Sequence, residues 1–335
     1  MVIEEPHAWS LRRLLLPLYF PAFLAYLANG LTVSFIVLYA LELGARPAAA
    51  GIIAALPHVG TLLFDLQAGR LIDRYNLKQV HLLSALSMGL ISILIGILPG
   101  MLFFVPLLLL FGAARTNWRI CQVAVVRRLV APQMRGRALA LMGGMVRTGS
   151  FLGPVAGGYL ASAFGLPALF LAAGLLLLAT SGTYILLAPS LPAPGVAIRT
   201  GGVTGAFRRH ARVLLTAGTG IVILGVLRAA RPVLIPLYGE SLGLSLRQIG
   251  LVMGAGGLAD TLLFYPAGLI YDRFGIKRGA VLCLSLFSCG LLLIPFSDGF
   301  YSLLFVAALI GTGNGFGAGV NMTLSAELAP DDEVG

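Results

Sequence analysis

The chain has 335 residues, of which 58% are hydrophobic and only 11% are charged, and its formal net charge is +10. No soluble core needs that much apolar surface, so the composition places the chain among polytopic membrane proteins. The basic excess does not indicate a nucleic-acid partner, because most Lys and Arg residues lie in short loops between apolar runs, as in membrane proteins of fixed orientation.

Ten apolar runs are long enough to cross a bilayer, since a helical span takes roughly 20 residues. Each run is expected to be helical throughout, because lipid offers the backbone no hydrogen bonds. The expected fold is therefore an all-α polytopic membrane protein, whose first run is a retained helix rather than a cleaved signal peptide. The ten runs cover residues 14–40, 48–70, 80–98, 101–126, 138–163, 166–188, 211–238, 247–270, 279–296 and 300–328.

A charged stretch occurs twice and divides the chain into two related halves. Residues 65–78 read DLQAGRLIDRYNLK and residues 268–277 read GLIYDRFGIK, with Asp73 and Asp272 aligned at an offset of 199 residues. Between the halves, residues 191–210 are rich in Gly, Pro and Arg and predict a flexible linker. The predicted bundles therefore span residues 1–190 and 211–335.

The basic residues also predict the orientation of the chain. Sixteen of them lie on one side of the membrane and two on the other. The positive-inside rule makes the first side cytoplasmic, so we expect a multi-pass cell-membrane protein with a cytoplasmic N-terminus and linker. Six runs precede the linker and four follow it, so a full repeat would need two further helices. We therefore expect this chain to lack its last two spans.

Two motifs resemble those of the major facilitator superfamily of secondary transporters. GRLIDRYNLK and GLIYDRFGIK are similar to its loop motif G-x-L-x-D-R-x-G-x-[RK]. The first copy departs at Asn76, where the motif has Gly, although Asn also tolerates the positive φ expected at that turn. Residues 149–158, GSFLGPVAGG, resemble the fifth-helix motif of the family's antiporters. A third family motif, an Arg early in the fourth helix, is not matched, because residues 107–110 are all Leu.

The resemblance implies a fold of two pseudo-symmetric six-helix bundles, here without the last two helices, and alternating access around a mid-membrane site. It also implies that both charged stretches form gates. Asp73 and Asp272 are expected just after a helix, where each could cap a helix of the opposite half, and Arg74 and Arg273 would hold the carboxylates. The alternative is a solvated turn with ordinary positive-inside charges.

The fifth-helix motif supplies two further gating candidates, Gly153 and Pro154. Glycines on one helix face allow close helix approach, so we expect a pliable contact with the eighth helix, which has its own Gly-rich segment at 254–257. Ordinary tight packing is the alternative. The whole face comprises Gly149, Gly153, Pro154, Gly157 and Gly158.

Five arginines lie inside apolar runs, where a lipid-facing guanidinium costs at least ~2.5 kcal/mol. Only two carboxylates, Asp65 and Asp260, lie well inside apolar runs, and they cannot neutralise five arginines. We therefore expect a central cavity that attracts an anionic or zwitterionic solute, with Asn29 as a further lining residue. The alternative is that Arg119 and Arg231 clamp backbone carbonyls. The five are Arg115 and Arg119 in the fourth run, Arg147 in the fifth, and Arg228 and Arg231 in the seventh.

Asp260, in the eighth run, is the first candidate for proton coupling, because a buried carboxyl can exchange protons near neutral pH. Its alternative is a salt bridge to one of the arginines. His58 is the second candidate, with a core histidine as the alternative. Asp65 lies near the end of its run and is expected to pair with Arg127 or Arg128.

No catalytic triad or zinc spacing is present, and the three cysteines suggest no disulfide framework. Residues 311–319, GTGNGFGAG, lie inside an apolar run without a preceding strand, so they do not predict a nucleotide loop. We expect no enzyme activity, no metal and no cofactor, and a monomer whose partners are a small-molecule substrate, protons and the bilayer. The preferred function is proton-coupled export of a small organic solute. The alternatives are proton-coupled uptake of an organic anion, a membrane-embedded enzyme and a non-transporting fragment.

Overall fold

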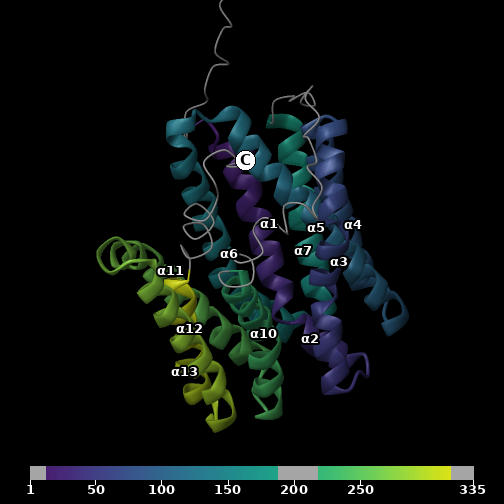
Figure 1. Cartoon of the computed structure of the whole chain (residues 1–335). Coiled ribbons are helices and arrows are strands. Elements are labelled where there is room, and N and C mark those ends of the chain that lie inside the picture. Colours follow the sequence, from purple (N-terminus) through teal and green to yellow (C-terminus); the bar gives the residue numbers. More distant parts are fainter. Residues whose placement is uncertain (1–12, 188–217, 318–335) are drawn as a thin grey trace, which may run out of the picture. The chain divides into compact units, whose positions relative to one another are not determined.

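The computed structural model describes residues 13–187 and 218–317, and for a few residues inside the helices it describes only the backbone (Figure 1). Throughout these two ranges the elements are helices and no strand occurs, which confirms the all-α fold class. The chain divides into two compact units, Met1–Ala197 and Ile198–Gly335. The predicted linker and both predicted domain boundaries fall outside the described residues.

The described part of the first unit, residues 13–187, contains six apolar segments in the predicted order. Its α-helices are α1 (Phe20–Val33), α2 (Ile36–Glu42), α3 (Pro47–Arg74), α4 (Leu77–Ile97), α5 (Met101–Leu129), α6 (Arg135–Phe164) and α7 (Pro167–Leu187), with the π-helix η1 (Leu15–Tyr19) before α1 and the 3₁₀ turn η2 (Pro132–Met134) before α6.

The first segment is broken, so the prediction of one continuous helix over residues 14–40 is wrong. α1 ends at Val33 and α2 begins at Ile36, with a turn between them. The hydroxyl of Thr32 donates back to the carbonyls of Ala28 and Asn29 at 3.3 Å each. Such back-bonding favours a bend in the helix. The N–H of Phe35 then bonds three residues back, to Thr32 at 2.9 Å, as in a 3₁₀ turn.

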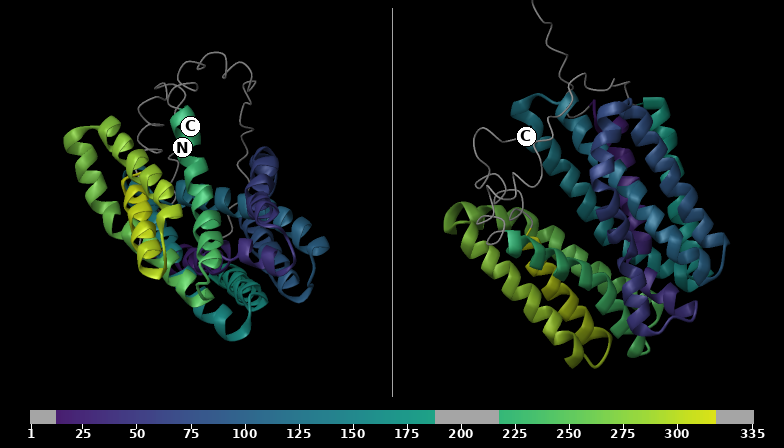
Figure 2. Two further views of the ribbon diagram at one scale, coloured as in Figure 1. Left: turned by 90° about the horizontal axis from the view of Figure 1, so that it is seen from below. Right: turned by 45° about the vertical axis from the view of Figure 1, so that its right-hand side comes forward.

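The helices of the first unit pack as pairs that are mostly distant in sequence. α1 lies against α6 and α7, α3 lies against α5, and α4 lies against α5 and α7 (Figures 1 and 2). The glycine face of α6 is turned toward α1: a Cβ on Gly153 would lie 2.9 Å from the N atom of Leu31, and one on Gly149 would lie 2.6 Å from the carbonyl of Tyr26. Tight packing of this face therefore occurs within the first unit, and the contact predicted with the eighth helix stays a prediction.

The second unit repeats this pairing. Its helices are α10 (Thr219–Ser241), α11 (Leu246–Phe274), α12 (Ile276–Leu293) and α13 (Phe300–Phe316), and the short 3₁₀ turn η4 (Ile294–Phe296) follows α12. α13 packs against both α11 and α12 (Figure 1), as α5 packs against α3 and α4. The sequence repeat thus has a counterpart in the packing within each unit.

Hydropathy supports a multi-pass chain. In the described part, seven helices are long and apolar enough to cross a membrane, and α13 is a shorter apolar helix. α6 and α11 have the length but are not among the seven. The count of ten spans therefore stays a prediction.

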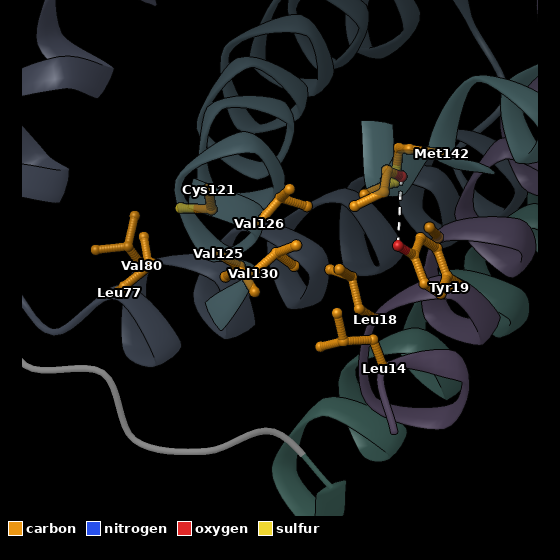
Figure 3. Packing of buried hydrophobic residues seen from close by; sticks show 12 residues of the cluster. Leu14, Leu18, Tyr19, Leu77, Val80, Cys121, Val125, Val126, Val130 and Met142 are labelled. Carbon is orange, nitrogen blue, oxygen red and sulfur yellow. Dashed lines mark hydrogen bonds between the residues drawn. The ribbon is translucent and has the colours of Figure 1, made fainter. Parts of the chain in front are cut away.

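One buried cluster joins the start of the first segment to α4, the end of α5 and the start of α6. Leu14 and Leu18 lie with Val125, Val126 and other side chains of this cluster (Figure 3). The hydroxyl of Tyr19 donates to the carbonyl of Ala138 on α6 at 3.3 Å. Van der Waals contact and interhelical hydrogen bonds of this kind hold helices together where lipid removes the hydrophobic driving force.

Glycine sets the distance between α3 and α5. A Cβ on Gly112 would overlap the carbonyl oxygen of Pro57, whereas a Cβ on Gly143 of α6 meets nothing within 4 Å. We expect Gly112→Ala to lower the thermal unfolding temperature in detergent, because separating the helices costs about 1–3 kcal/mol. Gly143→Ala should leave it unchanged or raise it slightly. Equal effects of the two substitutions would contradict this role of Gly112.

Candidate functional site

In the first unit, Arg115 is the centre of a polar cluster formed by α1, α3 and α5. Its Nη1 donates to Oδ1 of Asn29 at 3.5 Å and its Nη2 to Oγ1 of Thr61 at 3.4 Å. Both distances are longer than the usual 2.9–3.0 Å for this kind of bond. We call Asn29, Thr61 and Arg115 the first triad.

Thr61 is fixed by two carbonyls. Its hydroxyl lies 3.0 Å from the carbonyl of Pro57 and 3.2 Å from that of Gly112. Its oxygen is therefore left to accept from Arg115. Among the described residues, no carboxylate lies within ion-pair distance of Arg115, which is half-buried. The first triad thus holds one positive charge against neutral oxygens.

Arg119 lies one turn further along α5 and pairs with Asp65. Its Nη2 is 3.8 Å from Oδ1 of Asp65, and the two side chains are 59% and 41% exposed. The predicted pairing of Asp65 with Arg127 or Arg128 is therefore wrong. Asp65 lies on α3, which packs along α5, so its depth matches the middle of α5 rather than its end. An exposed pair of this kind contributes little to stability.

In the second unit, Asn314 of α13 lies between a cation and a carboxylate. Nε of Arg228 donates to Oδ1 of Asn314 at 2.7 Å, and Nδ2 of Asn314 donates to Oδ2 of Asp260 at 2.8 Å. Arg228 also donates to the carbonyl of Gly317 at 3.0 Å. Asp260 is buried, with 5% of its surface exposed. We call Arg228, Asp260 and Asn314 the second triad.

The other two arginines differ in their surroundings. Arg231 donates from Nη2 to the carbonyl of Met253 on α11 at 3.2 Å, which is the backbone clamp expected as an alternative for this residue. Arg147 is half-buried on α6. The predicted residues therefore form one cluster in each unit: Arg115 with Asn29 in the first, and Arg228 with Asp260 in the second.

The structure excludes the core alternative for His58, and its role in proton coupling stays a prediction. His58 is exposed on α3, so it is not a core histidine. The buried histidine is His81 of α4, which the sequence pattern did not single out. Its ring lies 4.0 Å from that of Tyr184 and 5.8 Å from that of Trp118, centroid to centroid. Its position at the start of an apolar run gave no sign of these aromatic neighbours.

The charged stretches are helix ends more than loops. α3 continues to Arg74 and α11 to Phe274, so Asp73 and Asp272 lie in the last helical turns rather than after them. The side chains of these two aspartates are not among those described. Arg74 is exposed, with its guanidinium carbon 5.9 Å from the centroid of the Tyr75 ring, and Arg273 is exposed at the end of α11.

The two copies make the next turn differently. Gly275 has φ +80°, as the motif's glycine suggests. Asn76 has φ −61° and begins α4 as its N-cap, with Oδ1 accepting the N–H of Lys78 at 2.9 Å. The expectation that Asn76 adopts positive φ is therefore wrong, because its side chain satisfies the helix end directly.

Thr61 is the site residue that the sequence pattern alone did not identify, and Asn314 is one of several polar residues in apolar runs that the pattern could not rank. The repeat carried the signal, since the offset of 199 residues aligns Thr61 with Asp260 and Arg115 with Asn314. A separate cavity of about 350 Å³ lies among α3, α4 and α5, and none of the predicted site residues lines it. In the described ranges, no three His, Cys, Asp or Glu side chains gather as a metal site would need.

Comparisons with known proteins show which proteins this chain resembles. The family model described as Major Facilitator Superfamily matches residues 18–335. Multidrug resistance protein MdtG of Escherichia coli O9:H4 (strain HS) is 27% identical over 310 residues, which cover 88% of this chain and 74% of the relative. MdtG of E. coli strain K12 / DH10B is also 27% identical, over 309 residues with the same coverage.

Solved structures share the fold at lower identity. A peptide transporter of the POT type has a TM-score of 0.73 at 14% identity, covering 97% of this chain and 85% of its own. The nucleoside transporter NupG has a TM-score of 0.71 at 14% identity, covering 92% and 82%. These likenesses concern the fold alone.

Asn314 is expected to contribute strongly to the stability of the second unit. Asn314→Ala removes two hydrogen bonds to charged groups, each worth ~1.5–3 kcal/mol, so the thermal unfolding temperature in detergent should fall markedly. The matched control is Asn117→Ala on α5, because Asn117 donates to the carbonyl of Ala113 within its own helix at 3.3 Å. Its effect should stay below about 1 kcal/mol, and a larger loss for Asn117 than for Asn314 would refute the assignment.

The N-cap of α4 gives a second prediction. Asn76→Ala should destabilise the first unit by about 1 kcal/mol and Asn76→Gly by only a few tenths, since glycine is an acceptable N-cap. Gln79→Ala, at an exposed site on the same helix, is the control. The unfolding temperature should be highest for Gln79→Ala, lower for Asn76→Gly and lowest for Asn76→Ala. An Asn76→Ala protein with the unfolding temperature of the parent would rule out the cap.

Proposed function

The chain belongs to the major facilitator superfamily, and on this premise we propose that it exports a small organic solute by alternating access, driven by protons. The family consists of transporters rather than enzymes. The direction of transport is proposed from the curated relatives, which are named multidrug resistance proteins, and from the fifth-helix motif. The chain would be a monomer with its N-terminus in the cytoplasm.

The observation that carries the choice of solute is the environment of Arg115. Its guanidinium is half-buried inside α5 and donates only to neutral oxygens, at 3.4 and 3.5 Å. A carboxylate would give it shorter and stronger charge-assisted bonds, two of them in parallel. We therefore propose an anionic or zwitterionic solute with Arg115 as its first contact, and with Asn29, Arg119 and Arg147 of the same unit as its proposed further contacts.

The second triad is proposed as the place where the proton acts. Asp260 is buried and accepts from Asn314, which in turn accepts from Arg228. Protonation would remove the negative charge of Asp260 and weaken the hydrogen bond that it accepts from Asn314. Binding of one proton would therefore alter the hydrogen bonding of all three residues. Arg231 would support this group rather than the solute. His58, exposed on α3 and within electrostatic reach of Arg115, is the second proton candidate.

Gating is proposed for the charged helix ends. Asp73 with Arg74, and Asp272 with Arg273, would hold the cytoplasmic side closed and release it as the bundles rock. Gly153 and Pro154 would let α6 bend during this motion, because proline removes one backbone hydrogen bond inside the helix.

Proton-coupled uptake of an organic anion is the second candidate. Drug exporters usually carry cations or neutral amphiphiles, and an arginine opposite neutral oxygens suits an anion better than a cation. This candidate has the same site residues and differs only in the direction of proton flow relative to the solute.

Transport into proteoliposomes separates the two candidates. With labelled cyclohexanecarboxylate outside, export by antiport predicts accumulation in vesicles with an acidic lumen, because protons leave as the solute enters. A weak acid is not trapped passively in an acidic lumen, so accumulation there reports the protein. Accumulation above that of empty liposomes only in vesicles with an alkaline lumen would instead favour uptake.

Variants test the residues in the same assay. Arg115→Gln should reduce carboxylate transport at least tenfold, since a bidentate charged contact is lost, while Arg137→Gln, exposed on α6, should change little. Asp260→Asn should abolish accumulation driven by the pH gradient but leave exchange of labelled for unlabelled solute. Transport of tetraphenylphosphonium in place of the carboxylate would overturn the proposed anion class.

A further inference from the structure

The two triads occupy equivalent positions in the repeat. The offset of 199 residues that relates Asp73 to Asp272 also relates Asn29 to Arg228, Thr61 to Asp260 and Arg115 to Asn314. All three members of one triad therefore have a counterpart in the other. The arginine and the asparagine have exchanged helices, and threonine has taken the place of aspartate.

The equivalence extends to the surrounding backbone within each unit. Gly112 abuts the carbonyl of Pro57, and Gly311 abuts that of Gly256, which are again positions 199 residues apart. One turn further along, the hydroxyl of Thr116 donates to the carbonyl of Thr61 at 3.4 Å. Its counterpart Gly315 lies against the carbonyl of Asp260, where a Cβ would be at 3.1 Å. The helix pairs α3–α5 and α11–α13 thus present their triads on matching backbones.

The triads differ in charge and in bond length. The first contains one arginine and no carboxylate, and its bonds measure 3.4 and 3.5 Å. The second contains one arginine and one carboxylate joined through an amide, and its bonds measure 2.7 and 2.8 Å. Arg119, one turn further along α5, already pairs with Asp65. One positive charge in the first triad is therefore left to be balanced.

We infer that the position shared by Thr61 and Asp260 determines which triad binds the anionic group of the solute, an inference that rests on the proposed function. In the second unit Asp260 is a built-in carboxylate that balances Arg228 through Asn314. In the first unit Thr61 leaves this place unfilled, so a carboxylate of the solute completes the triad. One uncompensated charge fits a monocarboxylate, held by Arg115 with Thr61 and Asn29 beside it.

The binding test uses Trp118 as reporter. The chain has two tryptophans, so Trp9→Phe leaves Trp118, three residues after Arg115 and in edge contact with Tyr26 at 5.4 Å. In this background, cyclohexanecarboxylate should change the fluorescence saturably and bind at least tenfold more tightly than its neutral isostere cyclohexanecarboxamide. Thr61→Asp should weaken carboxylate binding at least tenfold, because the new side-chain carboxylate occupies the position beside Arg115 that the solute would take. The dissociation constant of Thr61→Asn should stay within about threefold of that of the parent.

A ligand-free measurement keeps the inference testable on stability alone. Thr61→Asp should raise the unfolding temperature when Arg115 is present and lower it in an Arg115→Gln background, since a buried carboxylate then lacks its cation. A Thr61→Asp protein that fails to fold while Thr61→Asn folds would overturn the inference. The converse exchange, Asp260→Thr combined with Arg115→Gln, should restore stabilisation by the carboxylate that Arg115→Gln alone has lost.

The outcomes separate this inference from the function on which it rests. If Thr61→Asp binds cyclohexanecarboxylate as tightly as the parent does, the role of Thr61 is refuted while anion transport stands. If the parent protein does not distinguish the carboxylate from the amide, both the inference and the proposed anion class are refuted.

Discussion

A guanidinium inside a membrane-spanning helix needs hydrogen-bond acceptors close by, because lipid supplies none. This requirement organises both units. Glycine-mediated contacts bring α3 to α5 and α11 to α13 so closely that side chains of one helix reach acceptors on the next. Four arginines are matched to different kinds of acceptor: Arg115 to an amide and a hydroxyl, Arg119 to a carboxylate, Arg228 to an amide and a carbonyl, and Arg231 to a carbonyl.

Much of the fold follows from properties that are local in sequence. Apolar length alone locates the helices, and the recurrence of GRLIDR and GLIYDR establishes the two related halves before any packing is known. The break at Ser34 and Phe35 is different, because it depends on Thr32 turning its hydroxyl back onto the helix, and a run of apolar residues gives no sign of that choice. α3 likewise ends at Arg74, beyond its apolar run. A helix can extend into the membrane interface, where its residues are polar, so hydropathy does not mark the point at which it ends.

Most residues of the two triads stand out in the sequence, but Thr61 does not, and neither do the pairings. Arg115, Asn29, Arg228 and Asp260 stand out because polar residues are costly in apolar runs. Which of them meet depends on the rotation and relative depth of neighbouring helices. Asp65 illustrates this point: counting along the sequence suggested a partner at the end of α5, and the packing of α3 against α5 gives Arg119 near its middle instead. Asn314 could not be ranked above the other polar residues from the sequence, because an asparagine in an apolar helix can equally bond to its own backbone, as Asn117 does.

The turn before the second helix of each charged stretch has a consequence for how the two halves can diverge over time. At Gly275 the backbone itself demands glycine, since φ is +80°, and every other residue is strained there. At Asn76 the demand is only for a short side chain that accepts a hydrogen bond, which Asp, Ser and Thr also satisfy. The first turn therefore accommodates any of four residues, whereas the second accommodates glycine without strain. Two turns with the same place in the repeat therefore start their helices under different constraints, one set by the backbone and the other by a side chain.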